Sequence, residues 1–365
     1  MIIQAASGVV EGVLRKNFWL EISNNTISNI EDGINENADK VIEGILIPGF
    51  VDIHCHGGGG ARFSALTPGE IHSVIQTHRG HGTTSLFASL VTEPIEVLKA
   101  QIERLKPFVL SGQIAGIHLE GPYLSHARCG AHDPALLINP DLSEIKELLQ
   151  LADGSIAMIT IAPELPGASD AITHLTVAGV TVALGHTDGD FADAAAGTNA
   201  GGRVITHFMN AMDKGLNETS FASFVIADER LTVELILDGH HVPYKTAQEI
   251  YAAVGNRLIF VTDAMAAAGG TDGNYTIGEL PVIVKDGVAR LESNASLAGS
   301  TLTMDAIFLN AIKELALSIP EAVAATSTRA AKLMGLTDRG EIAVGNRADL
   351  LSYNENTQSI TLINS

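Results

Sequence analysis

The sequence predicts a (β/α)8 barrel of the TIM type, joined to a small discontinuous β-sandwich domain built from both termini. Three observations lead to this prediction: eight short apolar, β-branched runs between residues 45 and 265, amphipathic stretches between those runs, and strand-like segments with turns at both ends of the chain. Near-continuous apolar runs are typical of parallel strands buried on both faces, and a (β/α)8 barrel takes about 250 residues. We therefore expect the small domain in residues 1–46 and 335–365, and the barrel in residues 47–334.

Each expected element follows from a local pattern. The expected strands are residues 45–55, 83–91, 114–121, 156–164, 181–187, 203–210, 232–241 and 257–265. Amphipathic periodicity predicts helices at residues 67–80, 94–109, 141–152 and 242–254. Thr67, Thr92 and Asp141 lie near the starts of the first three helices and are expected N-caps. Residues 275–299 are predicted to form a β excursion after the last strand, with the sequence KDG as its turn.

The composition limits the class of protein. Hydrophobic residues make up 46% and charged residues 18% of the chain, which favours a globular protein. The formal net charge of −20 repels nucleic acid and anionic membranes, so neither is an expected partner. The N-terminus lacks a signal-peptide pattern and no apolar stretch reaches the roughly 18 residues of a membrane span, so we expect a cytoplasmic protein. Cys55 and Cys129 are expected to be free thiols rather than a bridge.

Histidines and carboxylates gather at the ends of the expected strands, where (β/α)8 barrels place their active sites. Neutral imidazoles and carboxylates are the ligands of zinc, iron and similar divalent ions. Taken singly, a histidine at a strand end is commonly only hydrogen-bonded, and Asp263 could cap a helix. Together these residues predict a metal site, whereas His118, inside the third strand, is expected to pack within the barrel. The residues at the strand ends are His54, His56, Glu120, His186, His207, His241 and Asp263.

The chain resembles a known family in several segments that occur in order over nearly its whole length. They are PGFVDIHCHGG, GIHLEGPYLS, GAHDPALL, TIAPE, ALGHT, THFMNAM, DGHHV, VTDAM, LAGSTLTMD and GEIAVGNRADLL. On these segments the chain is similar to the N-acetylglucosamine-6-phosphate deacetylases of the amidohydrolase superfamily. The resemblance implies a barrel with a small β domain, a divalent metal cofactor and a homodimer.

The resemblance also implies the metal ligands, residue by residue. Glu120, His186 and His207 would form the main site. His54 and His56, with Glu120 and Asp263 nearby, could hold a second ion, so one or two ions per subunit are expected. Zinc is the first expectation, with iron, manganese, cobalt or nickel as alternatives.

The implied activity is hydrolysis of N-acetylglucosamine 6-phosphate to glucosamine 6-phosphate and acetate. A bound metal lowers the pKa of its water, and the hydroxide would attack the acetyl carbonyl. Asp263 would act as general base and then as general acid, and His132 would stabilise the oxygen of the tetrahedral intermediate. By resemblance the sugar site is lined by Ala131, His132, Asn210, Ala211, His241, Leu297, Ala298 and Gly299.

The chain departs from the family at the phosphate site. After the segment NAM the family has His-Arg-x-Pro-Gly, whose arginine binds the sugar phosphate, whereas this chain has DKGLNETSFAS at residues 213–223. Counted from His207, Glu218 takes the arginine position, or a neighbouring residue does if the loop is shifted; Lys214 is the nearest replacement cation, with Lys245 as a further candidate. The alternative substrate is therefore a different or unphosphorylated N-acetyl amino sugar.

Two other classes of function are weaker alternatives. A cyclic-amide amidohydrolase typically carries a carboxylated lysine at the end of strand four, where this chain reads ITIAPE. A barrel that has lost its metal and serves as a scaffold would not need the full set of ligands. The sequence leaves open the metal, the number of ions, the sugar epimer, the oligomer size and the reactivity of Cys129.

Overall fold

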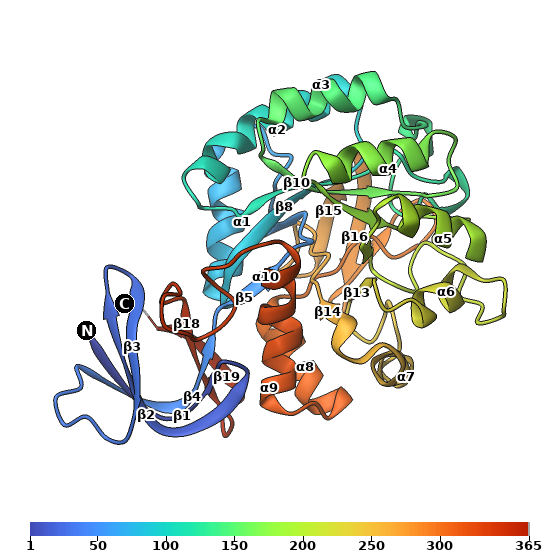
Figure 1. Ribbon diagram of the computed structural model, residues 1–365. Helices are drawn as coiled ribbons and strands as arrows, with labels where there is room; N and C mark the ends of the chain where they lie inside the picture. Colours follow the sequence, from blue (N-terminus) through green and yellow to red (C-terminus); the bar gives the residue numbers. More distant parts are fainter. Residues whose placement is uncertain (364–365) are drawn as a thin grey trace. The chain divides into compact units, whose positions relative to one another are not determined.

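The computed structural model describes residues 1–363, and the contacts divide the chain into two compact units (Figure 1). The first unit comprises Met1–Asp52, His78–Ser85 and the C-terminal segment that begins at Thr303. The second comprises Ile53–Thr77 and Leu86–Leu302. Within the described residues, no helix has the length and apolar character that a membrane crossing requires. Cys55 and Cys129 form no disulfide with one another, in line with the prediction.

Both termini contribute to the sheet of the small β domain, as predicted. Its six strands lie in the order β19-β18-β4-β1-β2-β3, with β1 and β4 parallel and the other neighbours antiparallel. The strands are β1 Ile2–Val10, β2 Val13–Ser23, β3 Thr26–Asp32, β4 Lys40–Pro48, β18 Leu350–Asn354 and β19 Ser359–Ile363. Two-residue turns join β1 to β2 and β2 to β3, and all four turn residues have positive φ, as tight hairpins require. Phe18, Leu20 and Ile27 are fully buried in the core of this sheet.

The predicted barrel is an eight-stranded sheet in the order β14-β13-β12-β11-β10-β9-β8-β5. The neighbours from β8 to β14 are all parallel, and a parallel bridge between Cys55 and Ala264 joins the segments that follow the first and last strands. Every residue of β9 is buried, as expected for a strand covered on both faces. The strands are β5 Phe50–Asp52, β8 Thr83–Leu90, β9 Gly116–Glu120, β10 Ile156–Ile161, β11 Thr181–Leu184, β12 Val204–Ile205, β13 Thr232–Leu235 and β14 Leu258–Phe260.

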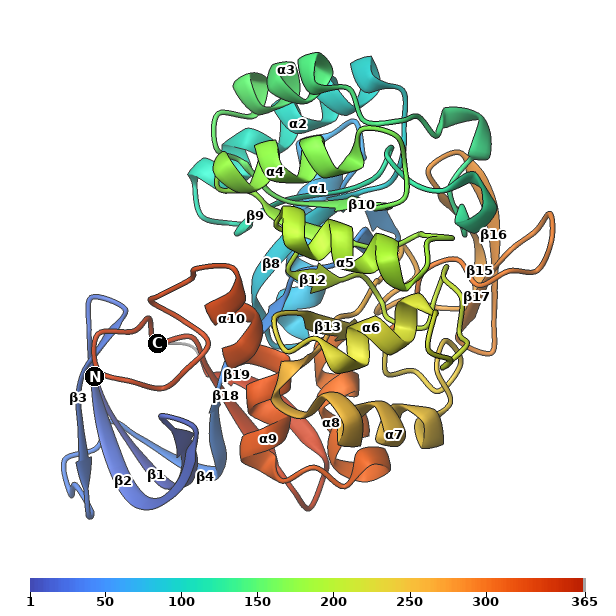
Figure 2. The same ribbon diagram turned by 45° about the vertical axis from the view of Figure 1, so that its right-hand side comes forward.

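Helices alternate with the barrel strands along the chain, and α2 to α7 lie around them (Figure 2). The helices are α1 Pro68–Gly80, α2 Ile95–Leu110, α3 Leu142–Ala152, α4 Ala168–Val177, α5 Phe191–Ala200, α6 Phe221–Ala227, α7 Tyr244–Val254, α8 Met304–Leu315, α9 Ile319–Val323 and α10 Arg329–Leu333. A π-helical turn, Ala324–Thr328, joins the last two, and 3-10 turns form at His126–Arg128, Pro134–Leu136 and Gly255–Arg257.

Two of the three predicted helix caps are confirmed. The Asp141 carboxylate accepts hydrogen bonds from the main-chain N–H groups of Ser143 and Glu144 at the start of α3. The Thr67 hydroxyl accepts from the Glu70 N–H at the start of α1. The prediction for Thr92 is wrong, because α2 begins after Pro94 without a side-chain cap.

The β excursion after the last barrel strand is also confirmed. Strands β15 Gly273–Ile277, β16 Leu280–Lys285 and β17 Val288–Leu291 pair antiparallel, and Asp286 and Gly287 form the predicted turn with positive φ. A further short pair, β6 Gly57–Gly58 and β7 Ala61–Arg62, follows the first barrel strand. The excursion places Ile277, Ser296 and Leu297 along the cavity described next.

Candidate metal centre and substrate cavity

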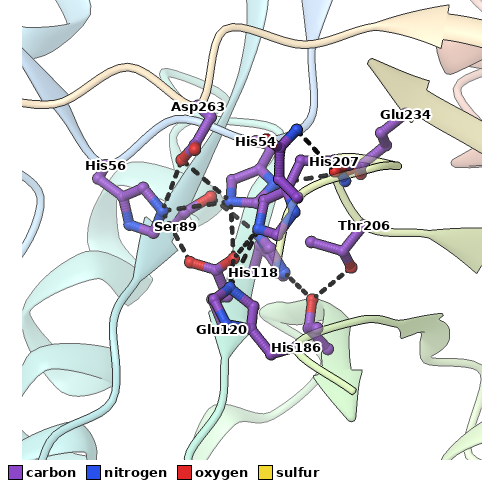
Figure 3. A network of polar contacts seen from close by, with 12 residues as sticks. His54, His56, Ser89, His118, Glu120, His186, Thr206, His207, Glu234 and Asp263 are labelled. Carbon is purple, nitrogen blue, oxygen red and sulfur yellow. Dashed lines mark hydrogen bonds and ion pairs between the residues drawn. The ribbon is translucent and has the colours of Figure 1, made fainter. Parts of the chain in front are cut away.

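The structure brings the histidines and carboxylates of five barrel strand ends into one buried cluster (Figure 3). Three of these residues, His186, His207 and Asp263, have φ of +48°, +28° and +46°. This left-handed conformation costs a non-glycine residue about 1–3 kcal/mol and persists only where the surroundings enforce it. The backbone thus leaves the sheet at the points where these side chains turn inward. The cluster consists of His54, His56, Glu120, His186, His207 and Asp263.

Glu120 lies at the centre of the cluster. Its Oε1 atom is 2.9 Å from His207 Nε2 and 3.1 Å from His186 Nε2. The two Nε2 atoms are themselves 3.0 Å apart. The predicted main site is therefore a convergent set of one carboxylate oxygen and two ring nitrogens.

The second histidine pair contacts both oxygens of the same carboxylate and Asp263. His56 Nε2 is 3.1 Å from Glu120 Oε2 and 3.3 Å from Asp263 Oδ1. His54 Nε2 is 3.5 Å from both Glu120 Oε1 and Asp263 Oδ1, and 3.2 Å from His56 Nε2. Glu120 is thus shared by two groups of ligand atoms, as a bridging carboxylate would be.

The hydrogen bonds show that this donor set fits a divalent cation. His186 Nδ1 lies 2.8 Å from the Arg128 carbonyl oxygen, which can only accept, so Nδ1 carries a proton and Nε2 is the ring nitrogen that faces Glu120. A nitrogen and a carboxylate oxygen at this distance need either a shared proton or a metal ion between their lone pairs. In residues 1–363, no lysine or arginine lies within ion-pair distance of Glu120 or Asp263. His54, His56, Glu120 and Asp263 place their ligand atoms close enough together to hold a divalent metal, and His186 and His207 add two more ring nitrogens beside Glu120.

The electrostatics of the cluster favour positive charge. Burial alone would lower the pKa of His54, but the carboxylates of Glu120 and Asp263 outweigh it and raise that pKa well above its usual value. Burial would likewise raise the pKa of Glu120, but His54 and the hydrogen bonds from the other histidines hold it well below its usual value. The carboxylates therefore remain ionised and available as ligands.

A cavity of about 340 Å³ opens on this cluster. Glu120, His186, His207 and Asp263 line it, and so do all the residues predicted to bind the sugar except Ala298. Ala298 is fully buried in the hydrophobic cluster of the β excursion. The predicted residues that line the cavity are Ala131, His132, Asn210, Ala211, Lys214, His241, Leu297 and Gly299.

The charged candidates for phosphate binding differ in their placement. Lys214 lines the cavity and, among the described residues that do so, is the one lysine or arginine. Glu218 and Lys245 are exposed and lie outside the lining. The carboxylate that the sequence places at the family's arginine position therefore does not face the cavity.

His132 is held as a neutral donor. The main-chain N–H of Thr92 lies 3.2 Å from His132 Nδ1 and can only donate, so Nδ1 carries a lone pair and Nε2 carries the proton. The Thr92 hydroxyl is 2.9 Å from the same Nδ1 atom. Burial lowers the pKa of His132 to about 4, against the opposing effect of Glu120, whose Oε2 is 3.3 Å from Nε2. Thr92, wrongly predicted as a helix cap, instead orients this ring.

Sequence reasoning missed two buried residues of the network. His118 was expected only to pack within the barrel; it is fully buried and its two ring nitrogens contact Ser89 Oγ at 2.9 Å and Thr160 Oγ1 at 2.8 Å (Figure 3). Glu234, on β13, contacts His54 Nδ1 at 3.2 Å. Its one available signal was a charged residue inside the otherwise apolar run TVELIL.

Comparison with known proteins decides the family. A family model described as the amidohydrolase family matches residues 45–362. The chain belongs to the amidohydrolase family. It is accordingly a hydrolase, and the cluster of imidazoles and carboxylates is its candidate metal centre.

Relatives of this amidohydrolase include two kinds of sugar-phosphate deacetylase. The N-acetylglucosamine-6-phosphate deacetylase of Vibrio furnissii is 33% identical over 340 residues, which span 90% of this chain and 84% of the relative. The N-acetylgalactosamine-6-phosphate deacetylase of Escherichia coli O157:H7 is 31% identical and covers 84% of this chain and 83% of its own length.

Solved structures agree with the sequence relatives. A mutant N-acetyl-D-glucosamine-6-phosphate deacetylase from Mycobacterium smegmatis, in complex with N-acetyl-D-glucosamine-6-phosphate, is 39% identical with a TM-score of 0.96. The match covers 100% of this chain and 97% of that one.

Proposed function

We propose that this amidohydrolase removes the acetyl group of N-acetylglucosamine 6-phosphate, giving glucosamine 6-phosphate and acetate. The observation that supports it best is one cavity lined together by the ligands of the main site and by Asp263, His132 and Lys214. These groups supply water activation, proton transfer, oxyanion stabilisation and a positive charge for the phosphate. Relatives named as deacetylases of N-acetylated amino sugar 6-phosphates support the same activity.

Glu120, His186 and His207 would hold the main ion, and His54 and His56, with Glu120 and Asp263, a second. Zinc is the proposed metal because nitrogen and oxygen ligands of this kind suit it, and iron, manganese, cobalt and nickel accept the same donors. A divalent ion here lowers the pKa of water and polarises a carbonyl oxygen.

Asp263 is the proposed proton carrier. It lines the cavity and is nearly buried, and although burial would raise its pKa, His54 and His56 hold that pKa below its usual value. Its carboxylate is therefore ionised and accepts a proton from water as the oxygen attacks the acetyl carbon. The same proton then passes to the sugar nitrogen as the C–N bond breaks, so acetate and a free amine leave together.

His132 is the proposed donor to the acetyl oxygen. Its Nε2–H is directed to the centre because Thr92 occupies the other ring nitrogen. As negative charge develops on the carbonyl oxygen, this donor stabilises it, an effect worth about 10²–10³ in kcat for a single oxyanion donor.

Lys214 is the proposed phosphate-binding residue. A hydrogen bond to a charged group contributes about 1.5–3 kcal/mol, and because Lys214 is exposed we expect the low end, about tenfold. Lys214→Ala should raise KM for the phosphorylated sugar about tenfold and leave kcat/KM for the plain sugar unchanged. Lys245→Ala, outside the cavity, is the matched control. An equal change in kcat/KM for both sugars would show that Lys214 does not recognise the phosphate.

The activity itself is tested by following both products. Purified protein loaded with zinc should release acetate and a primary amine in equal amounts from N-acetylglucosamine 6-phosphate. N-Acetylgalactosamine 6-phosphate belongs in the same assay, because one relative is named for it. No acetate from either sugar would exclude the proposed function. The homodimer and the cytoplasmic location stay predictions, and light scattering of the purified protein measures the first.

A further inference from the structure

Glu234 is a buried carboxylate in the interior of the barrel. It lies on β13, between β12 and β14 in the sheet, and none of its surface is exposed to solvent. Within residues 1–363, no lysine or arginine lies within ion-pair distance of it. Burying a carboxylate without a partner costs several kcal/mol of folding free energy. The contacts of Glu234 with His54 and with the main chain of His207 must offset that cost.

One oxygen of Glu234 joins the two halves of the metal centre. Its Oε2 atom lies 3.2 Å from His54 Nδ1 and 3.1 Å from the main-chain nitrogen of His207 (Figure 3). The amide of His207 donates to this oxygen, which fixes the backbone at a residue whose φ is +28°. Its other oxygen, Oε1, has no hydrogen-bond partner within the described residues.

The contact to Glu234 determines which nitrogen of His54 faces the centre. The Glu234 carboxylate accepts the Nδ1–H of His54, so Nε2, the atom that points at Glu120 and Asp263, is the ring nitrogen left to bind an ion. The Nδ1 atoms of His56 and His207 have no acceptor among the described residues. Of the two histidines of the second ion site, His54 and His56, only His54 has its Nδ1 atom oriented by a charged side chain among the described residues.

We propose that Glu234 is the positioning residue of the second ion site: it orients His54 for that ion and ties it to the backbone that carries His207. The inference rests on the metal centre of the proposed function, but not on the substrate. Carboxylates that support a metal-bound histidine typically contribute 10–100-fold to metal affinity. Since Glu234 contacts the ring of His54 but only the main chain of His207, its removal should weaken the second ion far more than the first.

The test is a zinc titration of metal-free protein against a competing chelator, without substrate. Wild type should bind two equivalents. Glu234→Leu should bind the second equivalent about 10–100-fold more weakly and the first within about threefold of wild type. Glu234→Gln retains an acceptor for His54, so its affinity for the second equivalent should lie between those of wild type and Glu234→Leu. Glu249→Gln, on the exposed surface of α7, removes one negative charge elsewhere and is the matched control.

Several results would overturn this inference. They are a single equivalent in wild type, wild-type affinity for both equivalents in a folded Glu234→Leu protein, or an equal loss of both ions together with a lower melting temperature. If Glu234→Leu fails to fold, the Gln variant decides, because a selective loss of the second ion supports the role and an unchanged titration contradicts it. Two bound ions in wild type without acetate release would refute the proposed function alone.

Discussion

Replacing His132 tests the chemistry of the centre most sharply, because the structure fixes its tautomer. With Nδ1 accepting from the Thr92 N–H, the proton on Nε2 makes the ring a donor without any positive charge. His132→Ala removes that donor. The loss of one oxyanion donor costs about 2.7–4 kcal/mol of transition-state stabilisation, so kcat should fall about 10²–10³-fold.

Thr92→Val provides the graded comparison. It removes the hydroxyl that contacts His132 Nδ1 at 2.9 Å but keeps the main-chain N–H that determines the tautomer. One neutral hydrogen bond contributes about 0.5–1.5 kcal/mol, so kcat should fall only about 2- to 13-fold. We therefore predict that kcat decreases from wild type to Thr92→Val and again to His132→Ala.

The pH dependence separates a neutral donor from an acid. Because burial lowers the pKa of His132 to about 4, its ring stays neutral at and above pH 6. The ratio of kcat between wild type and His132→Ala should therefore be constant from about pH 6 to pH 8. Acetate release measures kcat, and metal analysis of both proteins controls for the contact with Glu120. A kcat of His132→Ala within about threefold of the wild-type value would refute the reasoning. So would a ratio of the two kcat values that changed with a midpoint near pH 6.5.

Three further predictions concern the metal, the base and the contact between His81 and Asp305. Removal of metal by a chelator should abolish acetate release and added zinc should restore it; full activity in protein shown to be metal-free would contradict the proposed site. Asp263→Asn should lower kcat at least about 100-fold with the main ion retained, and a near-normal kcat would assign the proton to another group. The hydrogen bond from His81 to Asp305, 2.8 Å long, raises the pKa of His81, so it stabilises the fold below about pH 6.5 and less as pH rises through that raised value. Because the His81 ring is partly exposed, His81→Gln should lower the free energy of unfolding in urea by at most about 1 kcal/mol at pH 6. The loss should be smaller at pH 9. An equal loss at both pH values would show that the ion pair does not contribute to stability.

The barrel could be predicted because parallel strands leave a strong local signal. Runs such as TTSLFASLV are apolar on both faces, and the strand observed there, β8, spans Thr83–Leu90. The runs at residues 203–210 and 257–265 were predicted too long, since β12 ends at Ile205 and β14 at Phe260. Beyond these ends the chain mixes apolar residues with the ligands His207 and Asp263, and the backbone turns to positive φ at both ligands, which composition does not reveal.

Short helices were the elements that periodicity did not detect. The helix α5 has the sequence FADAAAGTNA, whose small residues bury little apolar surface on one side. A weak amphipathic pattern of this kind resembles loop sequence, although Asp190 and Asp193 form a capping box at its start.

The ligand residues of the site were predictable, whereas the residues that orient them were not. His54, Glu120 and Asp263 could be placed together because the carboxyl ends of barrel strands meet at one face. Glu234 and Thr92 act through contacts to histidines that lie far away in sequence, at 3.2 Å and 2.9 Å respectively. Such contacts depend on register across the barrel, and a single sequence without the register does not specify them.

The proposed substrate can be tested by one comparison on the unmodified protein. The measurement is kcat/KM for acetate release from N-acetylglucosamine 6-phosphate and from plain N-acetylglucosamine, with zinc bound. With Lys214 in the cavity and Glu218 outside it, we predict that the phosphorylated sugar is favoured by about tenfold or more. A ratio that favours the plain sugar would contradict the 6-phosphate assignment.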